Sequence, residues 1–239
     1  MKKDSGFGIQ DSGAKTTRPS VLNSPLNPVS RILICLAGLL FASGAFAGAQ
    51  REEALSASVR AVLQRSVSDQ AAPKLAFGTQ DEADAWLKEM SHRLRKRIPD
   101  AESRLDFLST VHYEAKRAGL EPELVLGLIE VESGFKKYAV SSVGAHGYMQ
   151  VMPFWVREIG VRDHNLFHLR TNLRYGCTIL RHYLDIEKGD LYRALGRYNG
   201  SLGRPEYPNL VRAAWHNNWA LPHRTVSNGI RLPVAEPRG

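Results

Sequence analysis

The chain has 239 residues, 43% of them hydrophobic, which suits one domain of ordinary size with a buried core and some appendages. Its formal net charge of +8 favours anionic partners such as a membrane surface, nucleic acid or an anionic cell-wall polymer. Lysine and arginine do not cluster among aromatic residues anywhere in the sequence, and this argues against a nucleic-acid-binding protein.

Residues 1–49 are predicted to be an export signal with a long polar leader. The apolar run at residues 32–49 follows Arg31 and ends in an Ala-x-Ala pattern, with cleavage expected after Ala47. This run is short for a membrane span, so we expect a periplasmic protein, with retention of the run as a membrane anchor as an alternative. Once the signal is removed, Cys177 is the one remaining cysteine, and no internal disulfide is expected.

The rest of the chain divides into an arm, a domain and a tail. Residues 50–80 combine Ala, Ser, Gln and charged residues with little periodicity, which predicts a flexible or weakly helical arm, with a short helix near residues 51–65. Regular apolar spacing begins at residue 81 and predicts a single globular domain over residues 81–220. Residues 221–239 contain prolines and are predicted to be a C-terminal tail.

Apolar residues in the domain recur with the 3.6-residue period of a helix. A first helix is predicted to start with Asp81 as its cap and to end before Pro99. A second helix is expected to end at Gly119. Its inward-facing residues are predicted to be Leu105, Leu108, Val111 and Ala115.

Pro122 is placed to open a third helix, which Gly134 ends after about Ser133. A glycine-bearing loop follows at residues 136–148. The further expected helices are one near 153–158, one capped by Thr171, a short one opened by Asp190, and one near 207–218. Since no stretch alternates apolar and polar residues as a strand would, the predicted class is all-α.

Glu132 continues the apolar stripe of the third predicted helix. Val125, Leu128 and Ile129 lie at positions i, i+3 and i+4, and Glu132 lies at i+7. A carboxyl group that faces the apolar side is costly to ionise, so it keeps its proton near neutral pH and can act as a general acid. On position alone, an exposed glutamate without a catalytic role at a frayed helix end would be the better interpretation. Glu130 lies about 200° away around the helix and is expected to be structural.

Four ordered motifs accompany Glu132. They are Glu132-Ser133-Gly134-Phe135 with Ala139-Val140-Ser141, then Gly144 to Pro153, then Asn172-Leu173-Arg174-Tyr175-Gly176, and then Arg197-Tyr198-Asn199-Gly200. Together, over about residues 105–215, they closely resemble the soluble lytic transglycosylases of the goose-lysozyme-like superfamily. The resemblance implies a lysozyme-like single globular domain with a glycan-binding cleft.

The resemblance also implies roles for individual residues. Glu132 matches the catalytic glutamate, and Tyr198 matches the tyrosine that supports it. The residues that match substrate-binding positions are Ser141, Gln150, Met152, Tyr198 and Asn199. Departures from the family pattern, such as His146 and Tyr148, bear on subsite preference rather than on the acid.

The spacing of carboxylates fits the implied reaction. Most glycosidases need two carboxylates, but no Asp or Glu occurs between Glu132 and Glu158. The resemblance implies a peptidoglycan lytic transglycosylase that cleaves the β-1,4 bond from N-acetylmuramic acid to N-acetylglucosamine and forms a 1,6-anhydro product, without a metal or cofactor. A distant residue such as Asp163 or Asp185 could instead fold into the site and support hydrolysis.

Two alternatives therefore stay open, namely a lysozyme-type peptidoglycan hydrolase and a non-catalytic cell-wall glycan-binding module. The expected partners are peptidoglycan glycan strands, with a cell-envelope protein assembly as a further option, and a monomer is expected. Ser133 to Lys136 matches S-x-x-K, but its partner motifs are absent from the sequence. His164 and His168 lack the glutamate of a zinc-binding H-E-x-x-H motif, and Cys177 is expected to be a small core residue.

Overall fold

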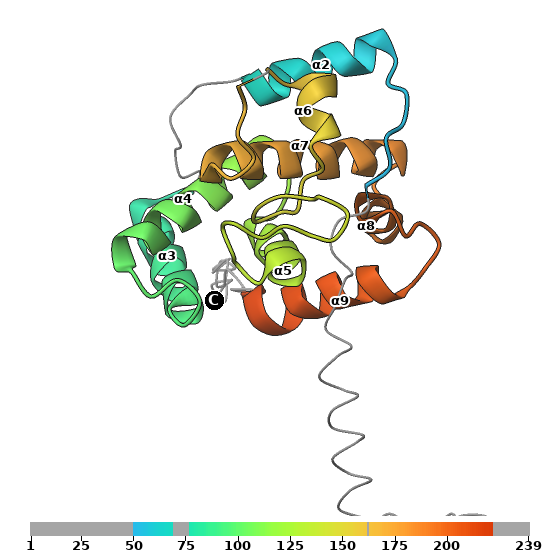
Figure 1. Ribbon diagram of the computed structural model, residues 1–239. Coiled ribbons are helices and arrows are strands. Elements are labelled where there is room, and N and C mark those ends of the chain that lie inside the picture. The colour runs from blue at the N-terminus through green and yellow to red at the C-terminus, as the bar shows by residue number, and fades with distance from the viewer. Residues whose placement is uncertain (1–49, 69–76, 162, 222–239) are drawn as a thin grey trace, which may run out of the picture. The chain divides into compact units, whose positions relative to one another are not determined.

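The structure is a computed structural model that describes residues 50–68, 77–161 and 163–221 (Figure 1). The predicted export signal, and the predicted tail beyond residue 221, lie outside the described residues. Within the described ranges the chain forms α-helices and one π-helical turn, and it forms no strand. The predicted all-α class is confirmed. No helix of the described residues has the length and apolarity needed to cross a membrane.

The helices surround a single hydrophobic core. In chain order they are α2 (Ala57–Ser68), α3 (Gln80–Leu94), α4 (Ala101–Arg117), α5 (Pro122–Ser133), α6 (Phe154–Ile159), α7 (Leu169–Ile186), α8 (Leu191–Asn199), α9 (Glu206–Ala214) and η1 (Trp215–Trp219). Helix α7 packs against α2, α4 and α8, and α5 packs against α4, α9 and η1. In Figure 1, α5 accordingly lies between α4 and α9, and the long loop after α5 crosses in front of it.

The first helix of the predicted domain starts differently from the expectation. Thr79, rather than Asp81, is the N-cap of α3: its hydroxyl accepts from the backbone N–H of Glu82, and the Glu82 carboxylate accepts from the backbone N–H of Thr79. This reciprocal pair satisfies two N–H groups that the helix leaves free, and Asp81 lies inside the first turn, where its charge suits the helix dipole. The predicted cap of α8 is confirmed, because Asp190 accepts from Arg193 N–H at 3.1 Å.

Two other details of the predicted helices are wrong. Leu105 was expected to face inward but is 44% exposed, while Leu108 and Val111 are fully buried; the buried face of α4 lies away from its first turn. Thr171 does not cap α7, which begins at Leu169 after an N-cap that makes no side-chain hydrogen bond. The helix therefore starts three residues earlier than Thr171 as N-cap would indicate.

Helix α5 can approach η1 closely because Gly127 has no side chain. A Cβ atom at Gly127 would lie only 2.7 Å from the backbone nitrogen of Trp215 and 2.8 Å from its Cα. Any larger residue would push the two helices apart. This contact fixes the position of α5, and the C-terminal turn of α5 carries Glu132.

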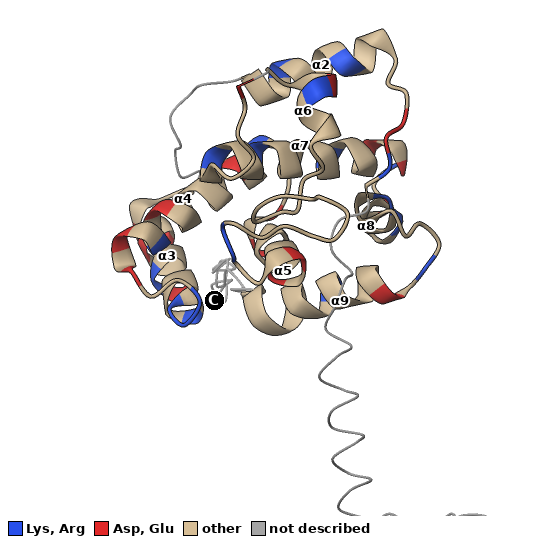
Figure 2. Cartoon of the chain, in the orientation of Figure 1, with Lys and Arg blue, Asp and Glu red and all other residues tan. Residues whose placement is uncertain are grey.

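A buried ion cluster joins α4 to α7. Glu114 is fully buried, and its carboxylate accepts from the Arg174 guanidinium at 2.8 and 3.2 Å, with Arg170 Nε 3.5 Å away. In Figure 2, acidic and basic positions of the ribbon lie close together at this junction. Since a buried charge without a partner is very costly, this pair ties α7 to the core in a defined register.

The part of the predicted arm that the structure describes packs against the domain. Leu63 and Val67 of α2 are buried, and α2 contacts α6 and α7.

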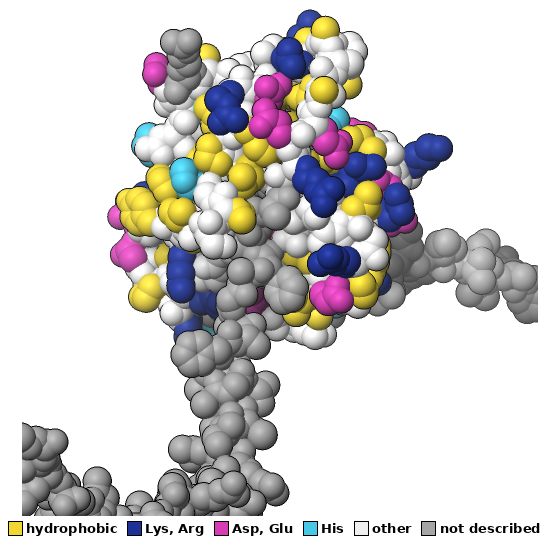
Figure 3. All heavy atoms as spheres, turned by 45° about the vertical axis from the view of Figure 1, so that its right-hand side comes forward, with side chains coloured by type: hydrophobic (Ala, Val, Ile, Leu, Met, Phe, Trp, Pro, Cys, Tyr) yellow, Lys and Arg dark blue, Asp and Glu magenta, His cyan; other side chains and the backbone are white. Residues whose placement is uncertain are grey.

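The surface of the domain carries both signs of charge, and Lys and Arg gather on part of the face shown in Figure 3 with fewer acidic side chains among them. Two arginines of α8, Arg193 and Arg197, share the carboxylate of Glu187.

Candidate active site

Glu132 lies in the last turn of α5, and its side chain is only 5% exposed. Gly134 ends the helix in the left-handed conformation, with φ at 58°, a geometry that costs glycine little. The chain then turns into the loop that leads to α6. The prediction that Glu132 faces the apolar side of its helix is confirmed by this burial.

Burial raises the pKa of Glu132 from 4.5 to about 8, because the charged form loses its hydration. One contact opposes this shift: the Tyr207 hydroxyl donates to Glu132 Oε1 and favours the charged form. The other oxygen, Oε2, is buried and has no hydrogen-bond partner among the described residues. Glu132 is therefore mostly protonated at neutral pH.

The hydroxyl that contacts Glu132 belongs to Tyr207, whereas the resemblance pointed to Tyr198. Tyr207 is in the first turn of α9 and is 1% exposed. Tyr198, in α8, is fully buried, and its hydroxyl donates to the backbone carbonyl of Met149 at 2.8 Å. Sequence reasoning missed Tyr207 because it lies 75 residues from Glu132 and outside the four motifs.

The loop between α5 and α6 is held by side chains from three helices. Asn172 of α7 accepts from Met149 N–H at 2.8 Å and donates to the carbonyls of His146 at 2.9 Å and Leu166 at 2.8 Å. Ser133 of α5 donates to the Tyr148 carbonyl at 2.7 Å. Together with the Tyr198 bond to Met149 from α8, these bonds fix the loop backbone beside α5.

Glycine is required at one point of this loop. Gly147 has φ at 76°, and a Cβ atom there would lie 2.4 Å from Asn172 Nδ2 and 2.6 Å from the Leu166 carbonyl oxygen. Both the left-handed backbone and the close approach exclude other residues. Gln150 also has positive φ, at 48°, a strained conformation of the kind that gathers at functional sites.

The residues expected to bind substrate lie in different surroundings. Gln150 is 1% exposed, and its Nε2 donates to the carbonyls of Ala139 and Gly147 at 3.2 and 2.9 Å. This amide nitrogen therefore links separate parts of the same loop. The Ser141 hydroxyl accepts from Ala145 N–H at 3.0 Å within the same loop.

Met152 is partly buried against the core, where the loop meets α6. Asn199, at the end of α8, is 6% exposed, and its Nδ2 donates to the Ser201 hydroxyl at 3.1 Å. The Asn199 Oδ1 atom is buried without a partner among the described residues.

No second carboxylate accompanies Glu132 in the loop. In Figure 2 the loop after α5 carries basic residues and no acidic ones. Asp163 is exposed, and Asp185 is exposed and paired with Arg181 at 2.9 Å. Glu130 is structural as predicted, since it accepts from Arg97 at 2.7 Å and from two residues of η1, Asn218 at 2.9 Å and Trp219 at 2.7 Å.

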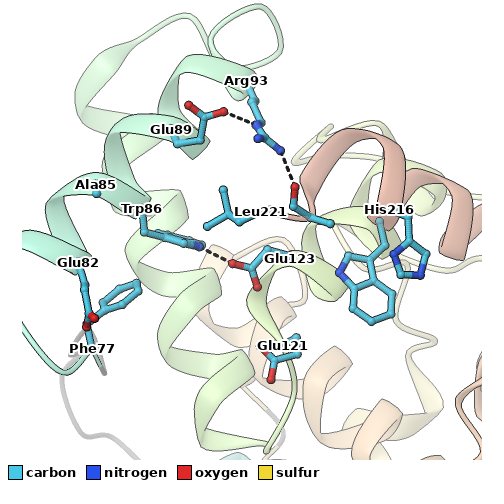
Figure 4. A pocket seen from close by; sticks show the side chains of 12 residues that line it. Phe77, Glu82, Ala85, Trp86, Glu89, Arg93, Glu121, Glu123, His216 and Leu221 are labelled. Carbon is cyan, nitrogen blue, oxygen red and sulfur yellow. Dashed lines mark hydrogen bonds and ion pairs between the residues drawn. The ribbon is translucent and has the colours of Figure 1, made fainter. Parts of the chain in front are cut away.

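A cavity of about 970 Å³ lies between α3, the start of α5 and η1, and Glu132 does not line it (Figure 4). Its acidic residues already have partners: Glu123 accepts from Trp86 Nε1 at 2.6 Å, and Glu89 pairs with Arg93 at 2.7 Å. We assign this cavity no part in the chemistry, because it opens at the opposite end of α5 from Glu132.

The described residues contain no group of three or more side chains that could hold a metal ion. His164, in the loop before α7, forms a 2.7 Å hydrogen bond with the Tyr175 hydroxyl through Nδ1, and His168 is exposed. Cys177 is a free, buried cysteine of α7, as predicted.

Residues 109–209, which contain Glu132 and the loop, match the family model described as "Transglycosylase SLT domain". Residues 109–209 are a transglycosylase SLT domain. This SLT domain runs from the middle of α4 to the first turn of α9. The Glu132–Tyr207 contact therefore joins two residues of the SLT domain.

Relatives of known name match parts of the same chain. The transglycosylase of Enterobacteria phage PRD1 is 32% identical over 103 residues, covering 43% of this chain and 38% of that protein. Membrane-bound lytic murein transglycosylase C of Actinobacillus pleuropneumoniae serotype 5b is 55% identical over 47 residues, or 20% of this chain and 13% of that protein. The enzyme of the same name from Haemophilus ducreyi is 51% identical over 57 residues, which cover 23% of this chain and 16% of that protein. The matched part thus spans well under half the length of these relatives.

Proposed function

We propose that the chain is a peptidoglycan lytic transglycosylase that uses Glu132 as its single acid/base. The SLT domain and the names of the relatives support this class of enzyme. The observation that carries the proposal is the buried Glu132 carboxyl group, whose pKa of about 8 keeps it protonated at neutral pH. A protonated carboxyl with one free oxygen is the group that a general acid requires.

The reaction proceeds in two proton transfers. Glu132 donates its proton to the oxygen that bridges N-acetylmuramic acid and N-acetylglucosamine, and the bond from C1 of the muramic sugar to that oxygen breaks. The Glu132 carboxylate then takes the proton of the muramic 6-hydroxyl while that oxygen bonds to C1. The enzyme is restored, a 1,6-anhydro sugar forms, and no water is consumed. The lack of acidic residues in the loop after α5 suits this single-carboxylate route.

The proposed site of action is the cell wall in the periplasm. Relatives are named as membrane-bound murein transglycosylases, and the sequence predicts an export signal at residues 1–49. Glycan strands of peptidoglycan are the proposed partner, with the protein acting as a monomer. The proposed substrate-binding set remains Ser141, Gln150, Met152, Tyr198 and Asn199, and we add Tyr207 as a residue that positions Glu132.

Digestion of purified peptidoglycan sacculi by the full chain tests the reaction directly. Mass spectrometry of the soluble products is expected to detect muropeptides that end in 1,6-anhydro-N-acetylmuramic acid. Products with reducing ends and no anhydro sugar would replace this proposal with a lysozyme-type hydrolase. Sacculi that bind the protein but release nothing would indicate a non-catalytic glycan-binding module.

Replacing Tyr207 by Phe is expected to change the pH dependence of cleavage. The Tyr207 hydroxyl lowers the pKa of Glu132, so its removal raises that pKa further. The alkaline limb of the pH–rate profile, where Glu132 loses its proton, should move to higher pH, and the maximal rate should fall by about ten-fold or less as orientation loosens.

Tyr198→Phe is the matched control for this measurement, because the Tyr198 hydroxyl contacts a loop carbonyl instead of the carboxyl group. Its alkaline limb should stay where the wild-type limb lies. If Tyr207→Phe leaves the limb unmoved, Tyr207 does not set the protonation of Glu132.

A further inference from the structure

The residues that precede α2 contact the loop between α5 and α6, where we propose that glycan binds. Residues 50–56, which we call the strap, have no regular secondary structure. Gln50 is 4% exposed, although it stands at the start of the described chain. Such deep burial of a polar side chain requires partners, and those partners are residues that we propose to bind substrate.

Both polar atoms of the Gln50 side-chain amide form hydrogen bonds with the backbone of the loop. Its Nε2 donates to the Gln150 carbonyl at 3.4 Å, and its Oε1 accepts from the Met152 backbone N–H at 3.2 Å. Gln50 also lies near Tyr198, whose pKa is raised by burial and by the nearby Glu132.

The Gln50 side-chain amide carries the same hydrogen-bonding groups as an acetamido group of the proposed substrate. A primary amide presents an N–H donor and a C=O acceptor, and an acetamido group of a cell-wall sugar presents the same two groups. The Gln150 carbonyl and the Met152 N–H form a complementary pair. An acetamido group and the Gln50 amide would therefore compete for the same two backbone atoms.

The acidic residues of the strap are held only by exposed ion pairs. Glu53 pairs with Arg197 at 3.3 Å and Glu52 with Arg157 at 3.7 Å, and both glutamates are more than half exposed. Exposed ion pairs of this kind contribute little to stability. Leu55, at the other end of the strap, is partly buried against the core, so a ligand could displace Gln50 while Leu55 keeps the segment attached to the domain.

We infer that residues 50–56 are an autoinhibitory strap, in which Gln50 occupies an acetamido-binding position of the groove until glycan displaces it. This inference rests on the proposed function. Glu132 is only 5% exposed, so a glycan strand can reach its carboxyl group only if neighbouring residues move.

The test measures glycan binding by the full chain, with Glu132→Gln present throughout to prevent turnover. The probes are the tetramer of N-acetylglucosamine and cellotetraose, which carries hydroxyl groups where the first carries acetamido groups. Adding Gln50→Ala is expected to tighten binding of the acetylated tetramer by about three- to ten-fold, because the competent state becomes fully populated. Binding of cellotetraose should tighten less, because it has no acetamido group to pair with the freed Gln150 carbonyl and Met152 N–H.

Gln80→Ala is the matched control, because Gln80 lies on α3 and, among the described residues, its side chain bonds to its helix neighbour Asp84. It should leave the affinity for both probes unchanged. Glu53→Gln should act in the same direction as Gln50→Ala but more weakly, and Glu89→Gln, which breaks an ion pair on α3, should have no effect.

Equal or weaker binding of the acetylated tetramer by Gln50→Ala overturns the inference, since Gln50 would then support the loop instead of blocking it. Digestion of sacculi by chains that keep Glu132 shows whether the strap inference alone is wrong or the proposed function is wrong as well. Anhydro products made at the same rate by the wild type and by Gln50→Ala refute the strap alone. No anhydro products and no binding of either probe refute both the strap and the proposed function.

Discussion

Replacing Glu132 by Gln is expected to reduce glycan cleavage by about a thousand-fold or more while the fold is retained. Glutamine has nearly the same shape as the protonated carboxyl, but it cannot give a proton to the glycosidic oxygen, and general acid catalysis contributes about 10²–10⁴-fold in rate. Release of soluble muropeptides from sacculi measures the loss, and circular dichroism measures the retained fold.

Glu130→Gln is the control for this variant. Glu130 is two residues away on the same helix and holds Arg97, Asn218 and Trp219, so its replacement should cost some stability but keep cleavage measurable. If Glu132→Gln keeps a tenth or more of the wild-type rate, another group supplies the proton, and the proposed mechanism is wrong.

The same variant is expected to be more stable than wild type at neutral and alkaline pH. The pKa of Glu132 is about 8 in the folded chain, against 4.5 for an ordinary glutamate. As pH rises between these values, the unfolded chain gives up its proton and the folded chain keeps it. The stability of the wild type therefore falls by up to about 1.4 kcal/mol per pH unit in this window. Urea unfolding at pH 5 and pH 8 should show the advantage of Glu132→Gln growing with pH.

The second large effect is expected for Asn172→Ala, which should lower the free energy of unfolding by about 3 kcal/mol or more. Asn172 is fully buried and satisfies Met149 N–H and the carbonyls of His146 and Leu166. Each buried polar group left without its partner costs about 1–3 kcal/mol. Thermal unfolding should show a drop in Tm of roughly 10 °C, and cleavage should weaken because the loop beside Glu132 is no longer fixed.

Asn165→Ala is the matched control, because the exposed Asn165 makes one side-chain bond, to Phe167 N–H at 2.8 Å. A loss of about 1 kcal/mol or less is expected there. If the two variants unfold at similar temperatures, the loop does not depend on Asn172.

The helices were predictable because their signals are local. Pro122 and Gly134 delimit α5 as expected, and Asp190 caps α8, since caps and breakers act within one or two turns. The errors have the same origin. Thr79 and Asp81 both fit a helix start, and only the return bond from Glu82 shows which residue is the cap. The exposure of Leu105 depends on where α3 lies against α4, which spacing within α4 cannot reveal.

The sequence by itself determined the helical class, the motifs of the SLT domain, and the place of Glu132 on the apolar side of α5, because periodicity and motif spacing are properties of neighbouring residues. Only the tertiary structure decided which groups surround that carboxyl. Tyr207 reaches Glu132 because α9 packs on α5. Gln50 reaches Gln150 across 100 residues of sequence. Such long-range contacts set burial, and burial sets the pKa on which the proposed chemistry depends.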